Sequence, residues 1–189
     1  EVTQLGKELE KIGSRVMGSE NHAKVGIIFD WENYWALEYT SGPNRDLRYV
    51  DQIEQMYNYF YNKNIAVDMI PIDADFSKYD LVAAPVLYMV KDGVAESLEA
   101  YVQAGGTLIT TYMSGIVGQS DNVHLGGYPG PLRKMAGVWV EEIDALAPEQ
   151  RNKIRFADGT EEECRLVCDL MHLEGAEKSH SMRAISMQA

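Results

Sequence analysis

The chain has few cysteines, few prolines and little positive charge. Its 189 residues include 2 cysteines and 6 prolines, and 17 Lys and Arg stand against 29 Asp and Glu, a net charge of −12. Nucleic acid and anionic membranes attract basic surfaces, so neither is expected as a partner. No apolar run approaches the roughly 18 residues that a membrane-spanning helix needs. The expected partners are therefore neutral molecules or other protein surfaces.

The two cysteines, Cys164 and Cys168, are too few for a disulfide framework. With His172 they form C-x3-C-x3-H, which on a helix would place all three on one face. A structural zinc site needs a fourth ligand and usually a turn between ligand pairs. We therefore expect free thiols in a reducing compartment, no metal site and a cytoplasmic location.

Short apolar runs alternate with helical patterns along the chain. Strands are expected at Val25–Phe29, Ile65–Ile70, Leu81–Pro85, Thr107–Tyr112 and Val138–Val140, and helices at Thr3–Met17, Leu47–Asn62, Gly93–Gln103 and Leu132–Ala136. Such alternation predicts a parallel sheet with helices on both faces. The expected fold class is α/β, a flavodoxin-like or class I glutamine-amidotransferase-like three-layer sandwich. Further on we expect a strand at Lys153–Phe156 and a helix at Glu161–Leu173.

The segment DWENYW, which follows the first strand, carries the most unusual chemistry. It begins at Asp30 and places Trp31, Tyr34 and Trp35 in what we expect to be a loop at the C-terminal end of a buried strand. Ligands and partners meet open α/β sheets at that edge. Large aromatic groups are costly to leave in water, so they are expected to pack on the domain itself, on a sugar or on another subunit.

The same segment excludes the usual phosphate-binding cofactors. A dinucleotide site needs G-x-G-x-x-G after the first strand, and the chain has neither this motif nor a P-loop there. The bulky Trp31 and the acidic Glu32 also oppose an anion at that turn. We therefore expect no cofactor.

The turn after the fourth strand, 111–115, corresponds to the position at which class I amidotransferases carry their nucleophilic cysteine. Here Met113 stands in that place, and its side chain cannot act in covalent catalysis. Ser114 is one residue further along, and His124 lies ten residues beyond Ser114. A Ser114–His124 pair would make the chain a degenerate amidotransferase-like enzyme. The alternative is that His124 only orders the loop.

Four segments together resemble the middle domain of family 42 glycoside hydrolases, the trimerisation domain of these β-galactosidases. They are residues 25–38, 79–90, 98–117 and 123–146, with sequences VGIIFDWENYWALE, YDLVAAPVLYMV, LEAYVQAGGTLITTYMSGIV and VHLGGYPGPLRKMAGVWVEEIDAL. The resemblance implies a scaffold that associates as a homotrimer, in a parent that hydrolyses terminal β-D-galactosides. The family's catalytic glutamates belong to its barrel, so no catalytic residue is expected here, and galactoside binding is expected only beside that barrel.

The resemblance also implies a division of the chain. Residues 1–23 would be the last barrel helix and a linker, 24–146 the trimerisation domain, and 147–177 the connection toward a C-terminal β-domain. Residues 178–189 depart from the family pattern, and we expect them to form a disordered tail without a role. For the domain at 24–146, the alternative to trimer formation is to shape the sugar entrance of a neighbouring barrel. Candidates for the interface or the sugar entrance are Trp31, Glu32, Tyr34, Trp35, Tyr112, Ile116, His124 and Leu125.

Overall fold

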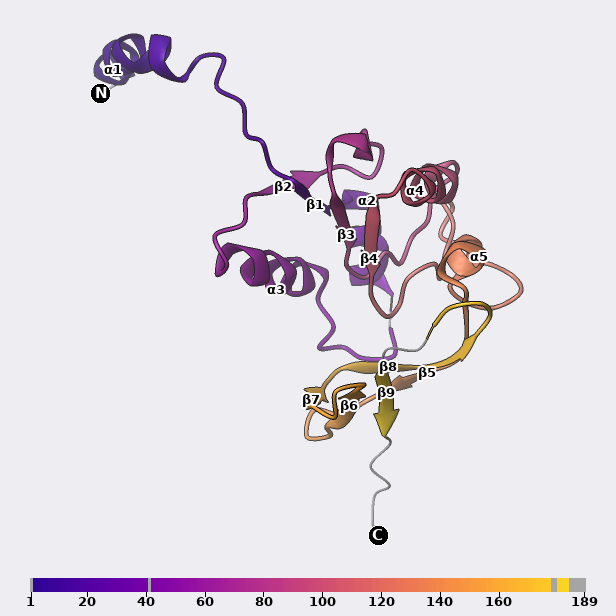
Figure 1. The fold of residues 1–189 in the computed structure, drawn as a ribbon. Coiled ribbons are helices and arrows are strands. Elements are labelled where there is room, and N and C mark those ends of the chain that lie inside the picture. The colour runs from indigo at the N-terminus through magenta and orange to yellow at the C-terminus, as the bar shows by residue number, and fades with distance from the viewer. Residues whose placement is uncertain (1, 41, 178–179, 184–189) are drawn as a thin grey trace.

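The computed structural model describes residues 2–40, 42–177 and 180–183. A four-stranded parallel sheet lies at its centre, in the order β2-β1-β3-β4 (Figure 1). Its strands are β1 (Val25–Ile28), β2 (Val67–Ile70), β3 (Leu81–Ala84) and β4 (Thr107–Thr110). Val25 pairs with Val67 on one side and with Leu81 on the other, so β1 and β3 are the inner strands. The predicted α/β class with a parallel sheet is confirmed.

Each face of the sheet is covered by its own apolar core. On one face, Ile27 and Ala83 pack with residues of α2 (Trp31–Tyr39) and α3 (Tyr49–Tyr61). On the other face, Ile28 and Val82 pack with η1 (Phe76–Lys78), α4 (Val94–Gln103) and η2 (Gly130–Leu132), which leads into α5 (Arg133–Ala136). Successive side chains of a strand point to opposite faces, so the uninterrupted apolar runs of β1 and β3 supply both cores.

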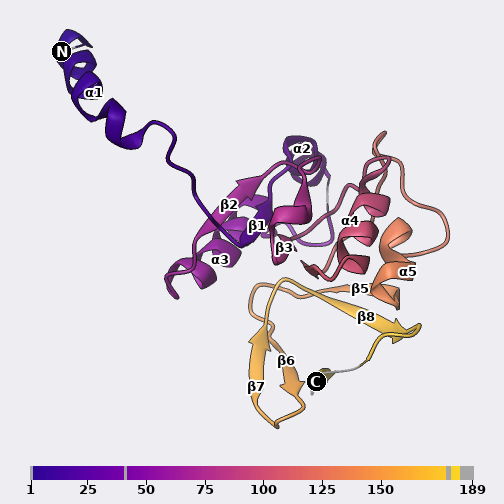
Figure 2. The same cartoon turned by 45° about the horizontal axis from the view of Figure 1, so that its top comes forward.

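The C-terminal quarter of the described chain forms two antiparallel sheets. The first is a ribbon of β5 (Val138–Ala145) and β8 (Val167–Leu173), which we call the β5–β8 ribbon. The second, in the order β7-β6-β9, contains β6 (Asn152–Phe156), β7 (Glu161–Cys164) and β9 (His180–Arg183). Figure 2 shows the ribbon running beneath the parallel sheet and the β6–β7 hairpin projecting from it.

Three predictions about local structure were wrong. Residues Trp31–Tyr39 form a helix and not a loop, because the Asp30 side chain caps the first turn. The segment Glu161–Leu173 forms β7 and β8 and not a helix, because its residues pair with β6 and β5. The strand expected at Val138–Val140 is longer, and it joins the ribbon instead of the parallel sheet. Of the expected tail at 178–189, the structure describes the four residues of β9, and the rest lies outside the described residues.

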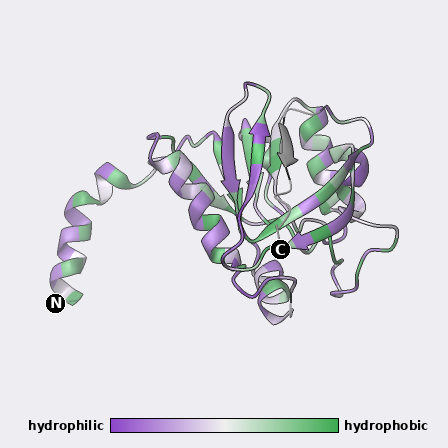
Figure 3. Cartoon of the chain, turned by 90° about the horizontal axis from the view of Figure 1, so that it is seen from below, coloured by the Kyte–Doolittle hydropathy of each residue, from purple (hydrophilic) through white to green (hydrophobic). Residues whose placement is uncertain are grey.

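The N-terminal helix α1 (Val2–Val16) stands away from the body of the molecule (Figures 1 and 2). Hydrophobic and hydrophilic residues alternate along it in Figure 3, and none of its residues is buried. Its apolar stripe is solvent-exposed and consists of Val2, Leu5, Leu9, Ile12 and Val16. The predicted amphipathic helix is therefore present, and its apolar face contacts no other element that the structure describes.

Candidate functional site

The aromatic segment begins with a capped and charge-paired turn. Asp30 follows β1 and accepts a hydrogen bond from the backbone N–H of Asn33 at 2.9 Å. Lys91 donates to the Asp30 carboxylate at 2.8 Å and also contacts the Glu32 carboxylate. Burial lowers the pKa of Lys91, but its hydrogen bonds to both carboxylates outweigh burial, so the pKa is raised. Asp30 and Glu32 therefore share one cation and fix the start of α2.

Asn33 ties α2 to the chain that follows β3. Its side chain is fully buried, donates from Nδ2 to the Val86 carbonyl at 3.0 Å and accepts from the Met89 backbone N–H at 2.8 Å. Val86 has a φ of 47°, an uncommon value for a β-branched residue. The amide of Asn33 thus supplies two partners to backbone that the parallel sheet leaves unpaired. Sequence reasoning missed this role, although Asp30 and Asn33 have the spacing of a helix cap.

The outer face of α2 carries an exposed aromatic ridge of Trp31, Trp35 and Tyr39. These residues are spaced by four, so they lie on one side of the helix, and they are 59%, 50% and 89% exposed. The two tryptophan rings lie 6.2 Å apart, and Trp31 also packs edge-on against Phe29 at 4.9 Å. Tyr34, from the same segment, instead packs against the core. The helix therefore displays part of the predicted aromatic cluster and buries the rest.

The turn after β4 is an elbow, which we define as Tyr112–Gly115. Met113 has a φ of 58°, in the left-handed region that L-residues rarely adopt, and its side chain is 3% exposed. Ser114 is also buried. Its Oγ lies 2.7 Å from the Thr110 hydroxyl, donates to the Thr111 carbonyl at 2.8 Å and accepts from the Leu87 backbone N–H at 3.2 Å. These contacts engage the serine in holding the elbow together.

His124 lies in the loop that follows the elbow, and its backbone N–H donates to the Ile116 carbonyl. Its Nε2 is buried without a hydrogen-bond partner, and no hydrogen bond joins it to Ser114 among the described residues. Ile116 belongs to the core at 6% exposure, whereas Leu125 is 99% exposed. Of the candidates Ile116, His124 and Leu125, only Leu125 presents a large apolar side chain to solvent.

The predicted grouping of Cys164, Cys168 and His172 does not form. Cys164 lies on β7, while Cys168 and His172 lie four residues apart on β8. The His172 ring stacks on Trp139 and its Nε2 is 2.6 Å from the Glu141 carboxylate. Both thiols are free, and burial raises their pKa values. Among residues 2–40, 42–177 and 180–183, no group of His, Cys, Asp and Glu has the arrangement of a metal site.

Asp169 on β8 is a further residue that sequence reasoning missed. Its Oδ1 is buried without a hydrogen-bond partner. Burial raises the pKa of Asp169 to about 6, although a hydrogen bond from the Met113 backbone opposes that shift. Tyr112 lies beside it, and burial together with the charge of Asp169 raises the pKa of Tyr112 to about 12. The ribbon therefore places a carboxyl group directly on the elbow.

Comparison with known proteins identifies the family of the chain. The family model described as "Beta-galactosidase trimerisation domain" matches residues 23–188. The chain belongs to this family. It is 51% identical over 172 residues to β-galactosidase LacZ of Lactobacillus acidophilus, an alignment that covers 91% of this chain and 26% of that protein. It is also 51% identical over 177 residues to β-galactosidase BgaB of Geobacillus sp., covering 94% and 26%.

Solved structures agree with this assignment to the trimerisation domain family. The β-galactosidase from Bacillus circulans sp. alkalophilus superposes with a TM-score of 0.91 at 45% identity, covering 97% of this chain and 28% of that one. The chain thus spans about a quarter of the length of the curated relatives it matches. The resemblance inferred from the four sequence segments is confirmed. Within the described part of the chain, no helix is long and apolar enough to cross a membrane.

Proposed function

We propose that this trimerisation domain holds three copies of a β-galactosidase together and takes no part in the chemistry itself. The proposal rests on the family assignment and on one observation, the exposed aromatic ridge of Trp31, Trp35 and Tyr39. Aromatic residues are enriched in protein interfaces, where burying them releases water from a large apolar area. The net charge of −12 favours neutral surfaces over nucleic acid as partners.

Trimer geometry adds a requirement. A closed ring of three identical chains uses heterologous contacts, so the ridge of one copy meets a different surface of the next. The ridge is suited to this because it is rigid. Trp31 packs on Phe29, and the first turn of α2 is fixed by Asp30, Lys91 and Asn33. A preordered aromatic surface loses little side-chain entropy when it is buried.

The ridge can be tested by removing it. We expect the chain to have the mass of three copies in light scattering across a dilution series. In the double variant Trp31→Ala, Trp35→Ala we expect dissociation at concentrations at least about tenfold higher, because loss of two interface tryptophans costs several kcal/mol. Tyr59→Ala is the matched control, since Tyr59 is also 59% exposed but lies on α3. A monomeric mass of the unmodified chain at every concentration contradicts the proposal.

A second candidate role uses the same tryptophans to contact sugar at the entrance of a neighbouring barrel. The observation in its favour is the exposure of two indole rings 6.2 Å apart, with the Glu32 carboxylate next to Trp31. Apolar sugar faces stack on such rings, and carboxylates accept hydrogen bonds from hydroxyls. Galactose is then expected to change the tryptophan fluorescence of the chain, and Trp35→Ala is expected to reduce that change. Unaltered fluorescence at saturating galactose contradicts this role.

The remaining expectations stay proposals. We propose a cytoplasmic location because both thiols are free, and we propose that the parent acts on terminal β-D-galactosides. A degenerate amidotransferase-like activity has little support. Met113 carries no nucleophile, and Ser114 is engaged in hydrogen bonds at the elbow.

A further inference from the structure

The β5–β8 ribbon is attached to the rest of the molecule at several places, one of which is a bridge between Val140 of β5 and Tyr128. Two others involve β8 and the residues next to the ribbon. The first is polar. Asn44, in the segment between α2 and α3, donates from Nδ2 to the carbonyls of Leu146 and Leu166, both at 3.0 Å. The second is the elbow, against which the ribbon places Asp169. Val167 of the ribbon joins the core that contains Met113. One attachment of the ribbon therefore lies at the elbow, close to the C-terminal end of β4.

Asp169 is an unusual group to find at such a contact. A carboxylate is normally satisfied by several donors when it leaves water. Here the Met113 backbone donates a hydrogen bond to the Asp169 carboxylate, while Asp169 Oδ1 is buried with no partner. A proton on the carboxyl group would remove the charge that burial disfavours. The contact is thus better suited to the neutral acid than to the anion.

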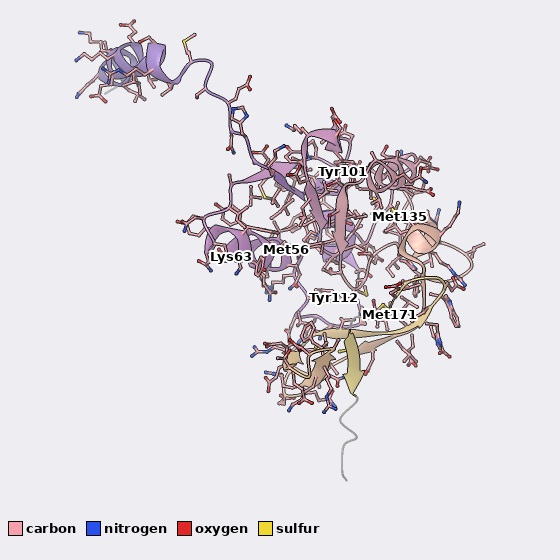
Figure 4. All side chains as sticks on the ribbon, in the orientation of Figure 1. Met56, Lys63, Tyr101, Tyr112, Met135 and Met171 are labelled. Atoms are coloured by element: carbon pink, nitrogen blue, oxygen red, sulfur yellow. The ribbon has the colours of Figure 1, made fainter. Side chains whose placement is uncertain are left out.

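The ionisable groups around Asp169 do not supply a compensating charge. From the elbow, Tyr112 faces it, and the Tyr112 hydroxyl donates to Gln52 of α3 at 2.8 Å. From β8 itself, Cys168 interacts with it electrostatically, and Cys168 is also close to Asp144 of β5. All of these groups are neutral or negative, and no cation pairs with Asp169 among the described residues. Figure 4 shows Tyr112 between the parallel sheet and the ribbon.

We propose that Asp169 is a proton-dependent latch for the ribbon. Uptake of one proton by its carboxyl group closes the contact between β8 and the elbow, and release of that proton loosens it. The proposal is independent of trimer formation, because it concerns a contact within one chain. It predicts that the ribbon is held more tightly in mild acid than at neutral or alkaline pH.

Linkage between protonation and opening sets the sign and size of the effect. A group whose pKa is raised in the folded state binds more protons there than in an open or unfolded state, so stability falls as the pH rises between the two pKa values. For Asp169 this window runs from the ordinary 3.8 to about 6, and the fall is complete only above the upper value. Opening of the ribbon is then expected to become about tenfold more frequent between about pH 5 and about pH 7.5.

Cys168 provides a local probe of the latch. It lies next to Asp169 on the opposite face of β8, where it contacts Asn152 of β6, and it is 5% exposed, so a reagent reaches it only when β8 moves away from its neighbours. In a Cys164→Ser chain it is the single thiol. The measured quantity is its labelling rate by a neutral aromatic disulfide, divided by the rate in urea at the same pH. This ratio removes the intrinsic pH dependence of the thiol. We expect it to rise about tenfold over the stated pH range.

The matched variants are Asp169→Asn and Asp144→Asn in the same Cys164→Ser chain. The asparagine introduced by Asp169→Asn is uncharged and still offers an oxygen to the Met113 N–H, so the ratio is expected to become nearly independent of pH. Asp144 is an exposed carboxylate on the neighbouring strand, so its variant should keep the rise of about tenfold. A rise that persists in Asp169→Asn overturns the proposal. A direct carboxyl carbon NMR titration of the unmodified chain is a second test, and an Asp169 pKa near the ordinary 3.8 also overturns it.

Discussion

Replacing Asn33 with leucine is expected to lower the free energy of unfolding by about 4 kcal/mol. The side chain is fully buried, and leucine has the same number and branching of side-chain heavy atoms, so the change mainly removes hydrogen bonds. The Val86 carbonyl and the Met89 N–H would both lose their amide partner in a site that water does not reach. Each buried backbone group without a partner costs roughly 1–3 kcal/mol.

Urea unfolding followed by circular dichroism measures this effect. Asn58→Leu is the control, because Asn58 is an exposed residue of α3 and its replacement should change stability by no more than about 0.5 kcal/mol. A loss below about 1 kcal/mol in Asn33→Leu would show that the segment around Val86 does not depend on this amide. The feature under test is that one amide, that of Asn33, satisfies both the Val86 carbonyl and the Met89 backbone N–H.

Replacing Gly115 with alanine is expected to cost at least about 3 kcal/mol, for two separate reasons. Gly115 has a φ of 68°, which an alanine adopts only with strain. In addition, an added Cβ would overlap the backbone carbonyl of Pro129, which packs against the elbow. Backbone cannot move aside as a flexible side chain does, so the loop that carries Pro129 must shift.

Gly93→Ala separates the two causes. Gly93 has a φ of 82°, and a Cβ there meets no atom within 4 Å, so it is expected to cost only about 1 kcal/mol. Thermal unfolding of both variants gives the comparison. Equal losses would mean that the approach of Pro129 contributes nothing and that backbone conformation alone demands glycine at 115.

The parallel sheet was predictable because its inner strands are buried on both faces. Runs such as Val25–Ile28 and Leu81–Ala84 are short, apolar and followed by helical patterns, and few other structures give that combination. The position of Met113 was predictable for a related reason, since a turn must follow β4. Met113 has a left-handed backbone in that turn.

The ribbon was not predictable from periodicity. Residues 161–173 place Cys164, Cys168 and His172 at helical intervals, and their short strands show no clean alternation of apolar and polar residues. Their pairing is set by β5 and β6, which are separate segments of the chain, so tertiary contacts decide the structure. The helix α2 was missed because its aromatic residues favour strands and loops, and the cap at Asp30 was not weighed.

The candidate site could be predicted only in part from the sequence, for the same reasons. Trp31 and Trp35 were identified from their chemistry, whereas Tyr39 joins them only once a helix fixes the spacing. Asp169 carries no sequence signal, because one acid in an otherwise mixed strand is ordinary. Its character comes from the elbow that faces it and from its burial, which are properties of the folded chain.

The elbow also bears on the engineering of a new enzyme in this fold. The strained turn at Met113 has a structural role although it carries no nucleophile. Ser114, Gly115 and the Pro129 backbone all pack against one another at this turn. A cysteine introduced by Met113→Cys would have the left-handed backbone of a nucleophile elbow. Its thiol would be out of reach of a substrate, because the side chain at 113 is 3% exposed. The carboxyl group of Asp169 would also repel the thiolate that catalysis requires. Opening a substrate path would thus mean redesigning the β5–β8 ribbon before adding any chemistry.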